Sequence, residues 1–488
     1  MTEDEYLPPP QTRYIPRCMQ YDNLQASGLA MDISARATIT MSSLFLGPAL
    51  LALADQEVAA CGYLCHGRVY GFRPTSLLTN IATISSLLVS VTLPLVGAVV
   101  DHSPYRKQVG AYTAAGMVIC KMIEFSVGPS TWFFVSVLQI VFLVLFSFHM
   151  TAIYAYTADL SADVSKQTWY NTSFYVLMYA STLLFLATVL SIVSWKNLDT
   201  VGTARVSLAL TSIISIICFS FAWTHLFTDR APLRAVPPGM TLWTCGFLKV
   251  WNTTQRIATH YPALVWLMIA IAFGEAAASA LIATSTTYMA SVLKMEGSEV
   301  GIVFFTVLVC GIPGSKMADL LASRKWSPTH SLLICNGLFI CATILASLVL
   351  RGPEDKNKVY FFASAWGIGL GWLHPVELSA FISLVEKGQE AEMMGIFLLV
   401  GQILTWLPPL IFTLLSESGV SLGVGLASLA VFFFCAVLAL CGMGNYEAAL
   451  RTLRERQNEE QIHGSELPSY DALAVESEDI PVSFAHLA

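Results

Sequence analysis

The sequence predicts an all-α membrane protein with twelve transmembrane helices in two six-helix bundles. Of its 488 residues, 55% are hydrophobic and only 12% are charged, whereas soluble globular chains carry about 25% charged residues. The apolar residues gather in runs of about 20, the length that spans a bilayer as a helix. A polar loop motif also recurs at equivalent places in the two halves, which indicates a duplicated bundle. This composition excludes a disordered chain, a disulfide scaffold and a nucleic-acid-binding protein, and it makes a lipid bilayer the expected surroundings.

The apolar runs are too long for strands and lack the alternation of an outer-membrane barrel. Six runs precede a polar break and six follow it. The predicted spans are 37–54, 75–100, 109–128, 131–156, 172–194, 204–226, 263–289, 298–315, 328–350, 359–384, 392–415 and 421–444. The expected organisation is a cytosolic N-terminal tail (1–36), an N-terminal six-helix bundle (37–226), a cytosolic linker (227–262), a C-terminal six-helix bundle (263–444) and a disordered cytosolic tail (445–488).

The second part of the linker carries large apolar residues at helical spacing, separated by polar ones. This pattern predicts an amphipathic helix on the membrane surface, although a plain polar linker remains the alternative. The residues concerned are Trp243, Phe247, Val250, Trp251 and Ile257.

Both tails are expected in the cytosol, because most of the 26 lysines and arginines then lie on the cytosolic side. The first residues form no signal peptide, so the first span is expected to direct insertion. Tyr470 to Leu473 match a sorting signal for endosomes or lysosomes, although four-residue matches also arise by chance. Cys61 and Cys65 share a loop on the opposite side, where they are either two free thiols or a local disulfide.

The junction between the second and third spans reads PLVGAVVDHSPYRKQ and contains Gly97, Asp101 and Arg106. A glycine lets a neighbouring helix approach closely. A carboxylate binds an arginine and the N–H groups at a helix N-terminus. These residue types therefore suit a cytosolic gate that holds two helical bundles together in one state and releases them in another.

The corresponding junction after the eighth span repeats the pattern with Gly314, Asp319 and Arg324. The spacing in both junctions resembles the short loop motif of the major facilitator superfamily. This resemblance implies two bundles that rock around a site at the membrane midplane. Loops that merely follow the positive-inside rule would explain the basic residues, but not the glycines and aspartates.

The stretch 367–410, with the linker helix and the seventh span, resembles the autophagy-related vacuole effluxer family within that superfamily. The resemblance implies a vacuolar or lysosomal membrane and export of amino acids released by degradation. His374 and Glu377 replace the glutamine and serine usual in the family, and Glu275 stands where the family usually has aspartate. The matching positions are Gly367, Gly369, Gly371, Pro375, Gly388, Glu392, Gly395 and Pro409.

Ionisable residues inside a span cost about 2.5–3.5 kcal/mol each on insertion scales, so they usually face a cavity or a partner. Glu275 lies in the middle of the seventh span, and His374 and Glu377 share one face of the tenth. We expect these three residues to bind substrate or protons, with structural hydrogen bonding as the alternative. No metal is expected, because the His374–Glu377 pair alone offers two ligands.

Three further ionisable residues are expected to be structural. His149 stands alone on an apolar run of the fourth span, where hydrogen-bonded packing is the commoner role. Lys121 and Glu124 are expected to form an ion pair that snorkels to the membrane interface.

The predicted function is therefore that of a secondary transporter that moves small solutes, with amino acids and proton coupling favoured. A facilitator for a sugar or an organic anion is one alternative, and a non-transporting receptor of the same fold is another. No nucleotide-binding loop, metalloprotease helix or nucleophile elbow is present, so neither an enzyme nor a cofactor is expected. The expected oligomeric state is a monomer.

Overall fold

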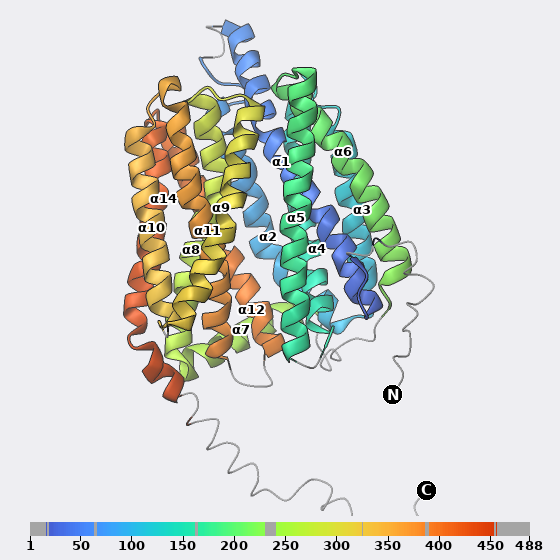
Figure 1. Cartoon of the computed structure of the whole chain (residues 1–488), viewed down its shortest axis with the longest axis vertical. Coiled ribbons are helices and arrows are strands. Elements are labelled where there is room, and N and C mark those ends of the chain that lie inside the picture. Colours follow the sequence, from blue (N-terminus) through green and yellow to red (C-terminus); the bar gives the residue numbers. More distant parts are fainter. Residues whose placement is uncertain are drawn as a thin grey trace, which may run out of the picture.

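The computed structural model describes 16, 19–62, 66–161, 164–229, 241–324, 326–385, 390–452 and 455. The described part of the chain contains fourteen α-helices. Most of them stand side by side, and α7 lies across one end (Figure 1). They are α1 (Leu24–Cys61), α2 (Leu77–His102), α3 (Arg106–Glu124), α4 (Trp132–Ala158), α5 (Val164–Lys196), α6 (Thr200–Phe221), α7 (Leu242–His260), α8 (Pro262–Ser291), α9 (Gly297–Ser323), α10 (Pro328–Val349), α11 (Val359–Ser383), α12 (Glu390–Ile403), α13 (Leu407–Glu417) and α14 (Leu422–Met443).

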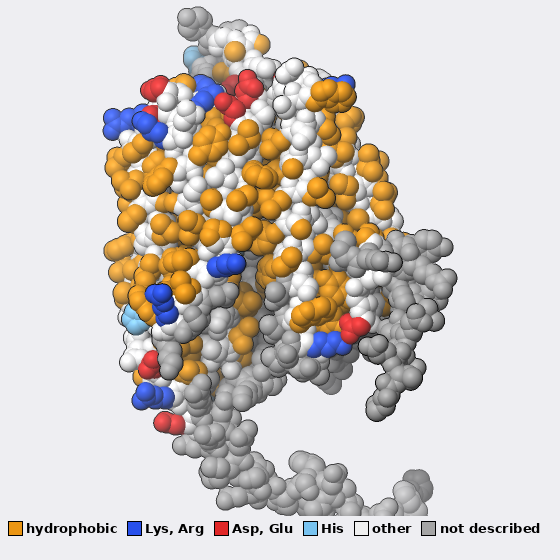
Figure 2. Space-filling model, in the orientation of Figure 1, with side chains coloured by type: hydrophobic (Ala, Val, Ile, Leu, Met, Phe, Trp, Pro, Cys, Tyr) orange, Lys and Arg blue, Asp and Glu red, His pale blue; other side chains and the backbone are white. Residues whose placement is uncertain are grey.

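The helices group into two bundles that follow the order of the chain. In the N-terminal half, α1 packs mainly on α5 and α6, while α4 packs on α2 and α3. In the C-terminal half, α9 packs on α11, and α14 packs on α8 and α10. Hydrophobic side chains cover the middle of the visible face, and most charged ones lie toward its two ends (Figure 2). This distribution is the one that a hydrocarbon layer requires.

Ten helical segments within the described residues are long and apolar enough to cross a membrane, and α12 and α13 together make one of them. Two predicted spans, at α3 and α11, are absent from the ten, although both form helices packed within their bundles. Charged residues shorten the apolar stretch of α3, which begins at Arg106 and ends with Lys121 and Glu124.

The first helix begins at Leu24, well inside the segment expected to be a tail. The Asn23 side chain caps it by accepting a hydrogen bond of 2.9 Å from the Gln25 backbone N–H. Its first turns carry Asp32 and Arg36, both buried, and these charges lowered the apparent hydropathy of the segment. The helix therefore begins earlier than predicted because these charges are paired inside the protein.

The helix expected in the linker is present as α7, which begins with a Thr241 capping box and packs against α2 and α8. Gly246 permits this contact, since a Cβ there would lie 2.4 Å from the Pro94 carbonyl oxygen. Phe247 and Trp251 remain exposed. These aromatic side chains suit the membrane–water interface.

The two bundles are joined by hydrogen bonds at the end where α1 finishes and α2 begins. Thr75 bonds to Ser416, and Thr79 to Thr413, each at 2.7 Å between hydroxyl oxygens. Closer to the surface, Arg68 forms an ion pair of 3.1 Å with Glu417. Further along α2, the Ser90 hydroxyl donates a hydrogen bond of 3.1 Å to the Gln402 carbonyl oxygen on α12.

Glycines allow α9 and α11 to touch backbone to backbone. A Cβ built on Gly314 would lie 2.2 Å from the Ile368 carbonyl oxygen, and one on Gly371 would lie 2.0 Å from the Gly311 carbonyl oxygen. Lipid gives helices no hydrophobic reason to associate, so close contact between small residues stabilises such a pair.

Replacing Gly367 with valine tests this crossing. Its Cβ would lie 2.3 Å from the Val307 carbonyl oxygen, so G367V should lower the free energy of unfolding by about 1–3 kcal/mol, as overpacking does. A thermal unfolding curve in detergent measures the change. Gly337→Val is the matched control, because a Cβ at Gly337 meets no described atom within 4 Å. Equal midpoints for the two variants would contradict the close crossing.

Candidate functional site

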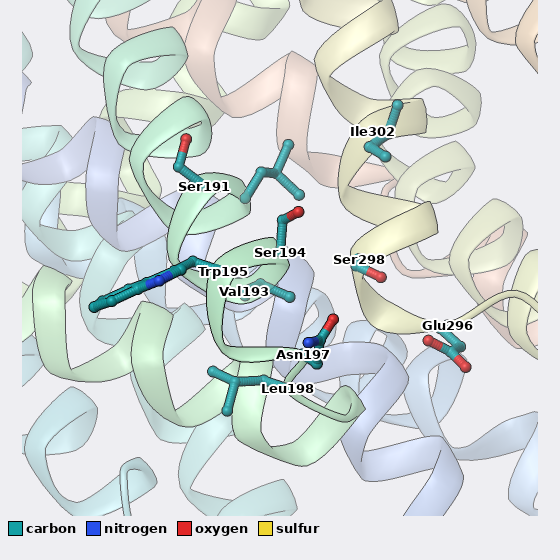
Figure 3. Close-up of a pocket in the computed structure, with 10 residues that line it drawn as sticks. Ser191, Val193, Ser194, Trp195, Asn197, Leu198, Glu296, Ser298 and Ile302 are labelled. Atoms are coloured by element: carbon teal, nitrogen blue, oxygen red, sulfur yellow. The ribbon is translucent and has the colours of Figure 1, made fainter.

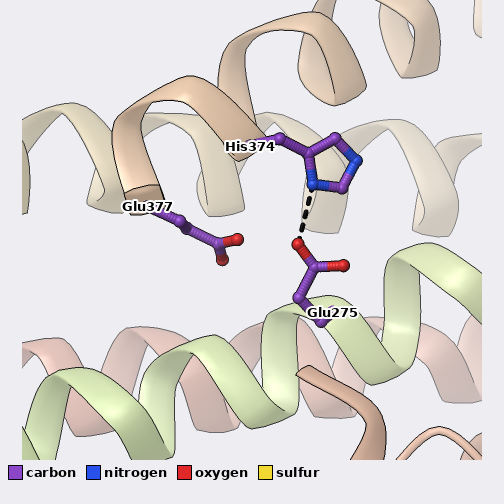
Figure 4. Close-up of side chains that lie close together, drawn as sticks. All are labelled: Glu275, His374 and Glu377. Carbon is purple, nitrogen blue, oxygen red and sulfur yellow. Dashed lines mark hydrogen bonds and ion pairs between the residues drawn. The ribbon is translucent and has the colours of Figure 1, made fainter. Parts of the chain in front are cut away.

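The acid expected in the seventh span is bonded to the histidine expected in the tenth. Glu275 lies on α8, and its Oε1 is 2.7 Å from Nδ1 of His374 on α11 (Figure 4). The His374 side chain is 54% exposed although it lies in the middle of its helix, and that of Glu275 is 21% exposed. The pair is therefore accessible to solvent in the interior of the C-terminal bundle.

Glu377 lies beside this pair and is almost completely buried. Its Oε2 has no hydrogen-bond partner among the described residues. Gly274 on α8 makes room for the carboxyl group, because a Cβ there would lie 3.3 Å from Glu377 Oε1. The same Cβ would lie 3.8 Å from Oδ1 of Asn336, another buried acceptor without a described partner. Several acceptor oxygens thus converge here without a matching donor.

Glu275, His374 and Glu377 each offer a ligand atom within 4.8 Å of the others. Two carboxyl groups at this distance do not ionise independently, so the trio is suited to hold a proton or a cation. The sequence predicted two partners for His374, Glu377 by spacing along the helix and Glu275 as a carboxylate that needs a cation, and the bond that forms is the one to Glu275 on α8.

A second polar cluster lies inside the N-terminal bundle, and the sequence did not reveal it. Asp32 on α1 has no exposed surface. Its Oδ2 is 2.8 Å from His149 Nε2 and accepts a bond of 3.1 Å from the indole N–H of Trp223, while Oδ1 accepts a bond of 2.5 Å from Arg36 Nε. His149 is packed by hydrogen bonds as expected, but its partner is a carboxylate on α1, three helices away in the chain.

The Arg36 side chain extends from this cluster toward the space between the bundles. Its Nη1 lies 2.8 Å from the sulfur of Met150 on α4. Tyr154 on α4 and Tyr175 on α5, which remain 38% and 54% exposed, interact electrostatically with both Arg36 and Glu275. We call Arg36, Tyr154, Tyr175, Glu275 and His374 the central site.

The expected ion pair of Lys121 and Glu124 forms, but it does not snorkel outward, so that part of the expectation is wrong. Both side chains are fully buried, with Nζ and Oε2 2.8 Å apart. The ammonium also donates to Ser43, and it lies 3.6 Å from the centroid of the Phe142 ring. These neighbours replace water around the charge, which is why the pair can remain inside.

In the first gate motif, Arg106 is almost fully buried and bonds to Asp159, with 2.6 Å between Nη1 and Oδ2. Both residues belong to the N-terminal bundle, so in this conformation the bond does not link the halves. A Cβ on Gly97 would meet no described atom within 4 Å, so the close approach expected there does not occur in this conformation. Asp101 lies at the end of α2.

In the second gate motif, Gly314 permits the close crossing of α9 and α11 described above. Arg324 is exposed just beyond the end of α9. The side chain of Asp319 lies outside what the structure describes. The two motifs are therefore not equivalent in their contacts.

One pocket lies apart from the central site. It has a volume of about 760 Å³ and lies between the end of α5 and the start of α9, where Trp195, Asn197 and Glu296 line it (Figure 3). Cys61, at the end of α1, is disulfide-bonded, so the reading of two free thiols is wrong for it. Tyr470 to Leu473 lie outside the described residues.

The fold is that of known membrane transporters. It is similar to the nucleoside transporter NupG, with a TM-score of 0.60, 12% identity and coverage of 87% of this chain and 100% of that one. It is also similar to a D-xylose-proton symporter, with a TM-score of 0.55, 12% identity and coverage of 85% and 97%. The chain therefore has the fold of these two transporters.

The chain belongs to the family described as "Vacuole effluxer Atg22 like", whose profile matches residues 29–452. Its relatives include autophagy-related protein 22 of Yarrowia lipolytica, 25% identical over 140 residues, a match that covers 28% of this chain and 23% of that protein. Another is the uncharacterized MFS-type transporter YxiO of Bacillus subtilis, 22% identical over 375 residues, covering 75% of this chain and 84% of YxiO. The protein is thus a multi-pass membrane transporter of this family.

Removing Asp159 tests the buried pair at the first gate motif. Asp159→Asn leaves the Arg106 guanidinium buried beside a neutral amide, and breaking such a pair costs about 3–5 kcal/mol. The midpoint of thermal unfolding should fall, and Arg106→Gln combined with Asp159→Asn should recover part of the loss. An unchanged midpoint in the single variant would show that the pair does not stabilise the bundle.

Lys166→Gln is the control for that experiment, because it breaks an ion pair whose two side chains are about half exposed. Lys166 and Asp22 are 2.6 Å apart. The Lys166 ammonium and the Tyr170 hydroxyl lower the pKa of Asp22, so it is ionised at neutral pH. An exposed pair contributes about 0–1 kcal/mol, so the midpoint should barely move.

Proposed function

We propose that the protein is a proton-coupled secondary transporter that exports amino acids from a vacuole or lysosome by alternating access. The observation that carries the proposal is the cluster of Glu275, His374 and Glu377 in the C-terminal bundle, in which His374 is exposed although it lies in the middle of its helix. Charged groups inside a membrane are costly and are kept for substrate and ion pathways. Membership of the effluxer family supports the direction and the organelle.

The bundles are arranged for one half-cycle of such a transporter. They are hydrogen-bonded at the end that we assign to the lumen, through Thr75–Ser416 and Thr79–Thr413. The central site would then communicate with the cytosol. The disulfide at Cys61 favours this orientation, because it places the bonded cysteine outside the reducing cytosol.

The trio supplies the coupling in this proposal. Glu275 alternates between pairing with a protonated His374 and binding the amino group of a substrate. Glu377 is buried nearby without a described donor, so it holds the proton that the pair does not use. Tyr154 and Tyr175 are the phenolic groups that interact with Glu275 from the other bundle.

Flux through reconstituted vesicles tests the substrate class. Vesicles loaded with each labelled amino acid, with D-xylose and with a dicarboxylate should release amino acids and retain the other two solutes. Robust release of a sugar or an organic anion without release of any amino acid would favour those alternatives. The absence of any flux would favour a receptor of the same fold.

Glu275→Gln should remove proton coupling while keeping the size of the side chain. In wild type, efflux should rise when the lumenal side is acidified from neutral to mildly acidic, since a proton then enters the trio from that side. The variant should retain part of its exchange activity, because the glutamine can still accept a hydrogen bond, but lose this dependence on the gradient.

Glu299→Gln is the control, because Glu299 pairs with Lys356 at 2.8 Å at the start of α9, far from the trio in sequence and partly exposed. Its pH profile should match wild type. Gradient-driven accumulation that persists in Glu275→Gln would assign the coupling to Glu377 instead.

We also propose that Asp101 acts in a cytosolic gate that forms when the bundles close on that side. Asp101→Asn should leave expression and thermal stability near wild type. Transport should fall by roughly tenfold or more, the range of a lost charged hydrogen bond. Initial rates in vesicles measure this effect. Full activity of Asp101→Asn would show that the motif is only an anchoring loop.

A further inference from the structure

Arg36 has donor groups left over after its contacts inside the N-terminal bundle. A guanidinium carries five N–H groups in a planar fork. Nε donates to Asp32 and Nη1 contacts the sulfur of Met150, but Nη2 bonds to no described residue. The side chain is 11% exposed, so part of it can be reached from the space between the bundles.

The cluster behind Arg36 fixes its position and leaves its charge incompletely matched. The Asp32 carboxylate is bonded to Trp223 and His149 as well as to Arg36. His149 is held in turn by Thr113, with 3.0 Å between Nδ1 and Oγ1. Because Asp32 is shared among three groups, Arg36 keeps the capacity to bind a second anion. A rigid fork of this kind binds a carboxylate through two parallel hydrogen bonds.

Arg36 and Glu275 stand on α1 and α8, two helices that pack against each other across the two bundles. Tyr154, one helical turn beyond Met150 on α4, interacts with both charges, and so does Tyr175 on α5. Thr40, one turn beyond Arg36 on α1, is also exposed in the middle of its helix. Tyr179 reaches across to α9, where a Cβ on Gly311 would lie 4.0 Å from its hydroxyl oxygen.

We propose that Arg36 binds the carboxylate of a zwitterionic amino acid whose amino group is bound by Glu275. This inference rests on the proposed function and adds to it the groups that recognise each end of the substrate. A cation on one bundle and an anion on the other match a molecule that carries both charges. An uncharged sugar would use neither charge, and an organic anion would use only Arg36. The tyrosines between them favour a neutral amino acid with an apolar or aromatic side chain.

Binding of ligand analogues to the purified full-length chain in nanodiscs tests the proposal. The probes are L-phenylalanine and L-leucine, the methyl ester of each, and phenethylamine and 3-phenylpropanoate as single-charge analogues. Wild type should bind both amino acids. It should bind the esters and the single-charge analogues about tenfold or more weakly, the range for losing one charged hydrogen bond.

Arg36→Gln should weaken phenylalanine binding by about tenfold or more and leave the affinity for its methyl ester unchanged. Arg36→Lys keeps the charge but not the fork, so it should recover part of the difference. Arg205→Gln is the matched control: it removes an arginine that bonds to the Val127 carbonyl group, away from Arg36 in the chain. Its affinities should equal those of wild type.

The outcomes separate this inference from the proposed function. Equal affinity of wild type for phenylalanine and its ester, or unchanged discrimination in Arg36→Gln, would overturn the role of Arg36 while amino-acid flux stands. Binding of 3-phenylpropanoate as tight as that of phenylalanine would overturn the role of Glu275. No amino-acid flux or binding in wild type would overturn the proposed function itself. If Arg36→Gln does not fold, the comparison of acid and ester in wild type decides the question.

Discussion

The fully buried carboxylate of Asp32 imposes a strict condition on the N-terminal bundle, because a charge removed from water must be matched by other groups. Those groups come from three parts of the chain: Arg36 from α1 itself, His149 from α4 and Trp223 from the short helix that follows α6. The resulting bonds hold α1 in the interior of the bundle. They also determine where the remaining donors of Arg36 are directed, so the arrangement of the central site follows from this one interaction.

In the C-terminal bundle, glycines instead of charged side chains bring the helices together. Gly314 and Gly371 bring α9 and α11 into backbone contact, and Gly274 leaves space for the Glu377 carboxyl group beside α8. The absent side chains allow two acids and a histidine from two helices to come together. In the N-terminal bundle, polar side chains thus hold the helices together. In the C-terminal bundle, small residues allow polar side chains to come into contact.

Hydropathy and motif spacing predicted the helical class, the two halves, the linker helix and the three ionisable residues of the C-terminal bundle. They missed the beginning of α1 and the role of Arg36, because a hydropathy sum penalises a charge whether or not it is paired. The same limitation misplaced Lys121 and Glu124, whose burial depends on Ser43 and Phe142 from other helices. The pairing of Glu275 with His374 was predicted because the nearby spans offer Glu275 no lysine or arginine, and the structure contains that bond.

Two of the hydrogen bonds between the bundles join hydroxyl groups, Thr75 with Ser416 and Thr79 with Thr413. Hydroxyl groups do not titrate in the physiological range, and screening by salt hardly affects them. Their strength would therefore be the same whether the adjoining compartment is acidic or neutral, dilute or rich in electrolyte. Water can replace each partner at little net cost, so this seal can open and re-form repeatedly without a large energetic barrier.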